Sequence, residues 1–174
     1  MKLLIEGWAQ KIRIYSRADK VPVATRAFLT SRKLDSHFSS FRASGHEAKL
    51  LENLAKESTL WQLMLGHTAA SFLFDGKQIY DATGYPSYKN INRLFSRLGI
   101  SNIGDLIGKK LHRDTETLIE GFQSVRTALA HSEPPIITIQ DVEAKLEDMR
   151  SLIGAIDKIF YKHVVAYSGS DCWL

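Results

Sequence analysis

Arg126 and His131 are the side chains of this sequence whose types and spacing best suit catalysis. Four residues separate them in the segment 124–135, which reads SVRTALAHSEPP. A histidine titrates near neutral pH and can act as a general acid or base. An arginine stays charged, and its planar fork binds two phosphate oxygens at once. The pair therefore indicates chemistry at a phosphodiester.

RNA can be cleaved without a metal ion when its own 2′-hydroxyl attacks the adjacent phosphate. This reaction needs a base for the 2′-hydroxyl, an acid for the departing 5′-oxygen, and positive charge that stabilises the phosphorane. Arg126 and His131 supply the cation and one acid–base group. Because one histidine cannot easily be both acid and base, a symmetric dimer that pairs two such sites would be chemically useful.

One amphipathic helix is expected to contain Arg126 and to end near His131. Its apolar stripe follows steps of four, three and four residues: Leu118, Phe122, Val125 and Leu129. At ~100° per residue, Arg126 lies about 70° from the centre of this stripe, on its flank. Asp114 is a candidate N-cap, and Pro134 should end the helix at or just after His131. The alternative is a structural role, because a cation in the last turn of a helix stabilises the helix dipole.

A last helix should begin after Thr138, because Thr138 and Asp141 resemble an acidic variant of the capping box. Its apolar residues alternate steps of three and four: Ile139, Val142, Leu146, Met149, Ile153, Ile156 and Phe160. Such a seam usually forms the core of a bundle, and it can also pair with the same helix of a second copy.

Five further helices are expected from periodicity and breaking residues: 3–17, 25–43, 46–74, 88–98 and 101–107. Val21-Pro22 separates the first two, Ser87 should cap the fourth, and Gly99 should end it. No strand-like alternation is longer than a few residues. The sequence therefore predicts an all-α fold with one core, which suits a chain of 174 residues.

These features together resemble the HEPN superfamily, the higher eukaryotes and prokaryotes nucleotide-binding domain. The segment Arg126-Thr127-Ala128-Leu129-Ala130-His131-Ser132 is similar to the family motif Arg-Asn-x-Leu/Ile-Ala-His-Gly. The resemblance implies a HEPN-type helical bundle that forms a homodimer and acts as a metal-independent endoribonuclease, with Arg126 and His131 as its catalytic residues. It also implies a toxin or anti-phage effector that cleaves RNA, with tRNA as a candidate substrate and an antitoxin or other regulatory protein as a candidate partner.

Thr127 departs from the family motif, which has asparagine, aspartate or histidine after the arginine. Its hydroxyl can still form hydrogen bonds, so we expect Thr127 to contact the substrate. The departure keeps a second function open, that of a non-catalytic bundle that binds RNA or nucleotide, or that serves another protein as a regulatory subunit. A purely structural helical module is a third interpretation.

The net charge of +4 is unevenly spread along the chain. Residues 1–45 have nine basic side chains against three acidic ones, and residues 86–113 have six against one. The second of these segments includes Lys109, Lys110 and Arg113, which we expect to guide an RNA backbone toward the catalytic pair. Residues 114–174 have ten acidic side chains against five basic ones. The alternative is a set of ordinary solvated helix faces.

The remaining composition favours a cytoplasmic protein. The single cysteine, Cys172, cannot form an internal disulfide. The most apolar run, residues 60–74, is shorter than the ~20 residues of a membrane span, so no membrane partner is expected. No metal-ligand spacing or Gly-rich phosphate loop is present, so neither metal nor cofactor is expected. The expected organisation is a basic N-terminal helical extension (1–45), the HEPN-like bundle (46–167) and a C-terminal tail (168–174).

Overall fold

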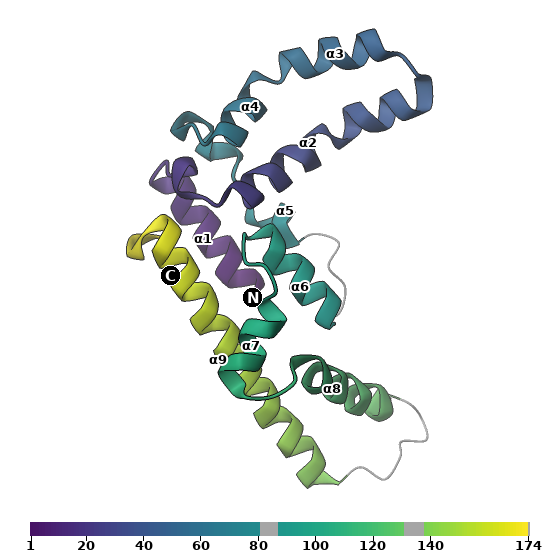
Figure 1. Ribbon diagram of the computed structural model, residues 1–174, viewed down its shortest axis with the longest axis vertical. Coiled ribbons are helices and arrows are strands. Elements are labelled where there is room, and N and C mark those ends of the chain that lie inside the picture. The colour runs from purple at the N-terminus through teal and green to yellow at the C-terminus, as the bar shows by residue number, and fades with distance from the viewer. Residues whose placement is uncertain (81–86, 131–137, 174) are drawn as a thin grey trace. The chain divides into compact units, whose positions relative to one another are not determined.

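The computed structural model describes residues 1–80, 87–130 and 138–173 (Figure 1). Every regular element in these ranges is helical and none is a strand, which confirms the predicted all-α fold class. The longer helices are α1 (Lys2–Ile14), α2 (Val23–Ser44), α3 (Glu47–Lys56), α4 (Ser58–Leu65), α6 (Tyr88–Arg97), α7 (Ile103–Leu111), α8 (Thr115–Ala130) and α9 (Ile139–Ser168). The short ones are η1 (Ala18–Lys20), η2 (Thr68–Leu73), α5 (Gly76–Tyr80) and η3 (Ser170–Cys172).

Contacts within the chain divide it into two compact units. The first unit consists of Met1–Asp81, Arg97–Gly99 and Val164–Leu174, and the second consists of Ala82–Ser96 and Ile100–His163. Helix α9 therefore begins in the second unit and ends in the first. The three predicted domains, residues 1–45, 46–167 and 168–174, have other boundaries than these units. That division into domains stays a prediction.

In the first unit, α1 packs closely against α5. Gly76 permits this approach, because a Cβ atom there would lie only 2.9 Å from the Cα atom of Glu6. Trp8 and Phe74 are both buried, and their rings meet edge to face at 5.2 Å between centroids. Helices α2 and α3 form a hairpin joined at Gly45, whose φ of +68° is the left-handed conformation that favours glycine.

The C-terminal residues are held against the start of the first unit. The Trp8 indole donates a hydrogen bond to the Ser168 hydroxyl at 3.1 Å, and that hydroxyl donates to the Lys20 carbonyl at 2.8 Å. Arg17 donates to the Ser168 carbonyl and pairs with Asp171. Cys172 is buried beside them, and this burial raises the pKa of its thiol. The C-terminal segment thus contributes to the packing of this unit.

The single long helix expected over residues 46–74 is wrong, because the chain breaks there at Glu57 and Gly66. Glu57 has a φ of −82° and a ψ of +43°, and its carboxylate lies 2.9 Å from Nε2 of His37 on α2. Gly66 has a φ of +82°, and a Cβ atom there would lie 2.9 Å from Cζ of Arg26. Gly66 ends α4 in the left-handed conformation that favours glycine, whereas the contact at Glu57 comes from α2 and is not revealed by helical periodicity within residues 46–74.

In the second unit, Gly104 of α7 is the point where three helices meet. Its N–H donates to Oδ1 of Asn92 on α6 at 3.0 Å, and its carbonyl accepts from the hydroxyl of Thr115 on α8 at 2.8 Å. The ring of Tyr88 lies against its Cα, since a Cβ atom at Gly104 would be 2.7 Å from Cζ of Tyr88. Phe95 and Phe160 pack edge to face at 6.0 Å and join α6 to α9.

The predicted caps are confirmed. The Ser87 hydroxyl accepts a hydrogen bond from the Asn90 N–H at 3.2 Å, and the Asp114 carboxylate accepts one from the Thr117 N–H at 2.7 Å. At α9 the capping box is reciprocal: the Thr138 N–H donates to the carboxylate of Asp141, and the Asp141 N–H donates to the hydroxyl of Thr138. Because these hydrogen bonds join residues only three positions apart, the sequence alone predicts where α6, α8 and α9 begin.

Two glycine-to-alanine substitutions in the second unit should change stability in opposite directions. Gly104→Ala should lower the free energy of unfolding by about 1–3 kcal/mol, because the new methyl group meets the Tyr88 ring. Gly154→Ala in α9 is the matched control. Nothing lies within 4 Å of its added Cβ, so the better helix propensity of alanine should raise the free energy of unfolding by about 0.5–1 kcal/mol. Urea titration of both variants measures the difference, and equal effects would contradict the packing described at Gly104.

Candidate functional site

Arg126 and Thr127 line a pocket of about 520 Å³ in the second unit. Helix α8 provides Gln123, Arg126, Thr127 and Ala130, and the start of α6 provides Ser87 and Asn90. The four α8 residues share one side of that helix. At ~100° per residue, the centre of this side is about 120° from the apolar stripe that begins at Leu118. The polar side of α8 therefore forms the pocket, while Leu118 and Ile119 are buried in the core.

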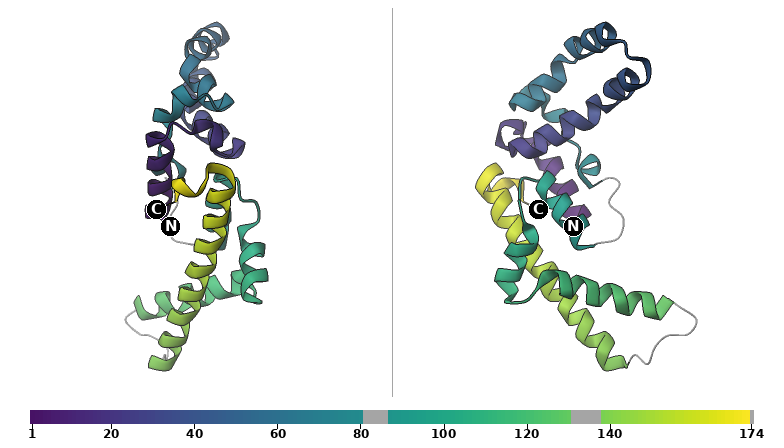
Figure 2. Two further views of the ribbon diagram at one scale, coloured as in Figure 1. Left: turned by 90° about the vertical axis from the view of Figure 1, so that its left-hand side faces the viewer. Right: turned by 45° about the vertical axis from the view of Figure 1, so that its right-hand side comes forward.

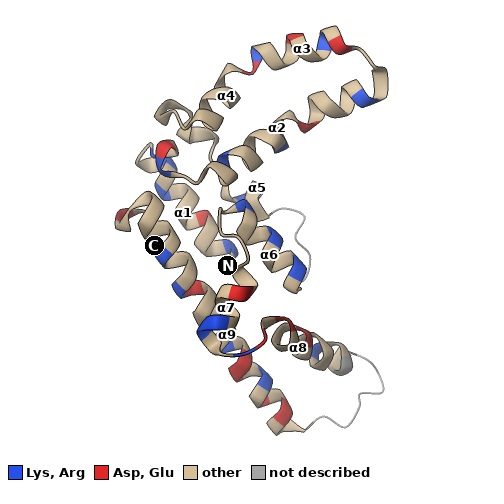
Figure 3. Cartoon of the chain, in the orientation of Figure 1, with Lys and Arg blue, Asp and Glu red and all other residues tan. Residues whose placement is uncertain are grey.

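The pocket wall is largely apolar in surface but contains one cation and several polar groups. Besides the Arg126 guanidinium, it contains two amides and two hydroxyls, which together offer both hydrogen-bond donors and acceptors. Arg93 Nη2 donates to Oδ1 of Asn90 at 3.1 Å and thereby orients that amide. Helix α6 has three basic residues, Lys89, Arg93 and Arg97, and no acidic one (Figure 3). This combination suits a ligand with a phosphate and further polar groups.

Two of the pocket residues could not be found from the sequence as functional candidates. Ser87 was predicted only as a cap, and Asn90 has no motif that points to it. Their partners on α8 are more than 30 residues further along the chain, so only the fold brings them together. One feature of the sequence could have indicated that Gln123 belongs to the site. It lies three residues before Arg126, on the polar side of the same helix.

His131, the other predicted catalytic residue, lies outside the described residues. The last residue of α8 is Ala130, which lines the pocket, and His131 follows it directly in the sequence.

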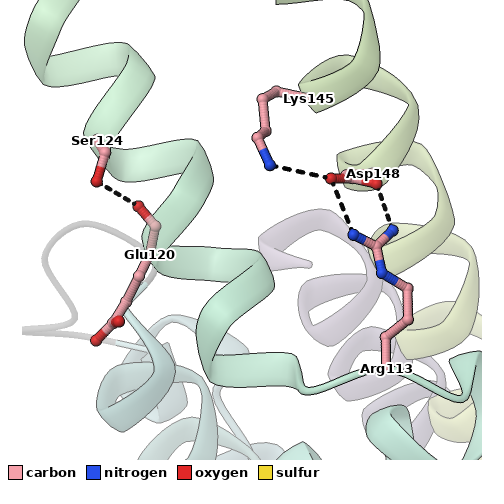
Figure 4. Close-up of polar contacts among 5 residues, drawn as sticks. All are labelled: Arg113, Glu120, Ser124, Lys145 and Asp148. Carbon is pink, nitrogen blue, oxygen red and sulfur yellow. Dashed lines mark hydrogen bonds and ion pairs between the residues drawn. The ribbon is translucent and has the colours of Figure 1, made fainter. Parts of the chain in front are cut away.

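The other expected substrate-binding residues lie apart from the pocket lining. Arg113 forms a two-pronged hydrogen-bonded ion pair with Asp148 of α9, and Lys145 approaches the same carboxylate at 3.4 Å (Figure 4). The hydrogen bond between them raises the pKa of Arg113, and the same hydrogen bond lowers the pKa of Asp148. Lys109 and Lys110 are exposed near the end of α7. Their contact with RNA stays a prediction.

Within the described ranges, no group of three or more His, Cys, Asp or Glu side chains could hold a metal ion. The same ranges contain no helix that is both long and apolar enough to cross a membrane.

The Arg113–Asp148 pair should give the fold a specific dependence on pH. Because the folded-state pKa of Asp148 is lowered, its ionised form stabilises the fold above the ordinary pKa of about 4, and this stabilisation disappears as the pH falls through the lowered pKa. Asp148→Asn should therefore cost about 1 kcal/mol at pH 7 and much less near pH 2. Thermal unfolding at both pH values measures this. In a double-mutant cycle with Arg113→Ala, strictly additive losses would contradict the pairing.

No model of a known family, no curated protein and no solved structure matches this chain. The resemblance to the HEPN superfamily therefore rests on the residues of the segment 126–132 and on the helical pattern around it.

Proposed function

We propose that this chain is a metal-independent endoribonuclease of the HEPN type, with Arg126 and His131 as its catalytic residues. The observation that supports it best is the pocket of about 520 Å³ in which Arg126 and Thr127 lie beside two amides and a second hydroxyl. A guanidinium in such a wall can bind a phosphate through two hydrogen bonds. Ala130 also lines the pocket, and His131 is the next residue in the sequence.

In the proposed reaction, the 2′-oxygen of RNA attacks the adjacent phosphorus and the bond from phosphorus to the 5′-oxygen breaks. One histidine accepts the proton of the 2′-hydroxyl, and an acid donates a proton to the departing 5′-oxygen. Arg126 stabilises the charge of the phosphorane, and the Thr127 hydroxyl donates a hydrogen bond to a phosphate oxygen. The products are a 2′,3′-cyclic phosphate and a free 5′-hydroxyl.

A homodimer would supply the second histidine, and α9 has a surface suited to it. Ile139, Leu146 and Ile153 repeat every seven residues and are 74%, 49% and 61% exposed. This stripe extends for about 21 Å along the helix. When two α9 helices pair antiparallel around Leu146, Glu143 of one copy comes near Arg150 of the other, twice by symmetry. Arg150 also pairs with Glu147 of its own helix, an exposed contact that can be exchanged at little cost.

A cytoplasmic toxin or anti-phage effector that cleaves RNA, tRNA included, is the biological role that fits this activity. Such an enzyme harms its own cell, so an antitoxin or another regulatory protein is its expected partner. Expression of the wild-type chain should then slow growth, and the loss of His131 should relieve that effect.

Cleavage of total RNA and purified tRNA in the presence of EDTA tests the catalytic proposal. Wild type should release fragments with 2′,3′-cyclic phosphate ends, and His131→Ala and Arg126→Ala should each reduce the rate at least about 100-fold. His67→Ala, which removes an exposed histidine of the first unit, is the matched control and should cleave normally. Equal cleavage by wild type and His131→Ala would contradict the proposed site. Binding of RNA without any cleavage would favour the non-catalytic bundle.

The dimer is tested separately by light scattering coupled to size-exclusion chromatography. Leu146→Glu places a charge in the middle of the exposed α9 stripe and should convert a dimer into a folded monomer that no longer cleaves RNA. Leu51→Glu is the control, since Leu51 is similarly exposed (57%) on α3 in the first unit. A wild-type chain that is monomeric at micromolar concentration, yet fully active, would contradict the dimer.

A further inference from the structure

The first unit contains another pocket, of about 570 Å³, that the proposed reaction does not use. One wall is a single side of α1, since its lining residues follow steps of three, one, three and one: Glu6, Ala9, Gln10, Arg13 and Ile14. The opposite wall is the segment that leads from η2 into α5. Pockets of ~300–1,000 Å³ enclose small organic molecules, so this one has room for such a ligand.

The pocket has apolar surface that the fold leaves uncovered. Phe74 is fully buried, whereas Phe72 and Ile14, from opposite walls, are 63% and 62% exposed. Exposed apolar surface that adjoins a pocket commonly belongs to a ligand-binding groove. A ligand with an apolar body would cover both side chains.

The acidic side chains of the pocket already have partners within the chain. The Tyr80 hydroxyl donates a hydrogen bond to Glu6, and the Asp75 carboxylate accepts one from the Lys77 N–H at 2.9 Å. The hydrogen bond with Glu6, partial desolvation and the charges of both carboxylates raise the pKa of Tyr80 to about 12. Two lysines offset these charges: Lys2, whose Nζ lies 5.1 Å from the centre of the Tyr80 ring, and Lys77, which lines the pocket.

Arg13 is the cation at the other end of the α1 wall. It follows Glu6 by seven residues, which is about 10 Å along the helix. Its guanidinium is exposed and forms no hydrogen bond or ion pair with any residue that the structure describes. A guanidinium binds a carboxylate through two parallel hydrogen bonds. The pocket therefore offers a cation next to apolar surface.

We propose that this pocket binds a small organic acid, in which one carboxylate is attached to an aromatic or aliphatic body. The carboxylate pairs with Arg13, and the body packs against Phe72 and Ile14. A single negative charge suits the pocket, because Glu6 and Asp75 would repel the second charge of a phosphate ester. This binding function belongs to the first unit and does not depend on the ribonuclease proposal.

Titration of the full chain with pairs of acids and their neutral amides tests the inference. We would follow backbone amide shifts by NMR with phenylacetate against phenylacetamide, hexanoate against hexanamide, and acetate, which lacks an apolar body. At least one acid should shift the amides of Gln10 and Arg13. It should also bind at least about tenfold more tightly than its own amide and than acetate, because hydrogen bonds between charged groups are the stronger ones.

Substitutions separate the two parts of the site. Arg13→Gln should abolish the preference for the acid over its amide, and Arg13→Lys should retain part of it, since the charge remains without the planar fork. Phe72→Ser should weaken the acid and the amide by the same factor. Arg42→Gln, at an exposed arginine of α2, is the control and should bind like wild type. If Arg13 only stabilised the dipole of α1, its loss would lower Tm and leave the preference unchanged.

Three outcomes would overturn the inference. The first is equal binding of each acid and its amide by the wild-type chain, or no shift of the pocket amides with either acid. The second is tighter binding of phenyl phosphate than of phenylacetate, which would indicate a phosphate site. The third is tighter binding of a tripeptide that ends in phenylalanine, which has the same ring and carboxylate and would indicate a chain terminus as the ligand.

Discussion

The backbone of Gly104 is the constraint on which the candidate site depends. Its N–H and its carbonyl are bound by side chains of two different helices, Asn92 of α6 and Thr115 of α8, while the Tyr88 ring covers its Cα. The described residues that line the pocket belong to α8 or lie at the start of α6. Gly104 of α7 is not among them, but its backbone is hydrogen-bonded to both of these helices. The absence of a side chain at position 104 is what allows the three helices to meet.

The basic side chains of the second unit divide into two physical roles. The two terminal nitrogens of the Arg113 guanidinium donate to the two oxygens of the Asp148 carboxylate, so this ion pair links the turn before α8 to α9. Arg126 instead lies on the exposed polar side of α8 among neutral polar groups. Arg126 therefore lies beside a space that a ligand can enter, whereas Arg113 serves a contact between two segments of the chain. Charge along the sequence does not predict this distinction, since Arg113 belongs to the basic segment 86–113 and Arg126 belongs to the acidic segment 114–174.

The sequence was sufficient wherever the determining hydrogen bonds were local. The caps by Ser87, Asp114 and Thr138 could be predicted because each bond spans three residues. The break at Glu57 could not, since its partner, His37, comes from another helix. Arg126 could likewise be predicted as a site residue because a local motif contains it. Asn90 could not, because its place in the pocket depends on contacts between α6, α7 and α8. The HEPN resemblance concerns only the part of the site that is local in sequence.

The apolar side chains of α8 and α9 are not equally buried along the two helices, and the exposed ones are relevant to the proposed dimer. Leu118 and Phe160 are almost completely buried, whereas Leu129 and Ile139, near the ends where the two helices diverge, are 56% and 74% exposed (Figures 1 and 2). Apolar side chains are thus covered near the start of α8 and exposed at the end of α8 and at the start of α9. Exposed apolar stripes of this kind usually mark interfaces. In the antiparallel pairing proposed above, Ile139 of one copy lies opposite Ile153 of the other, so one self-complementary contact would cover the exposed stripe of both α9 helices.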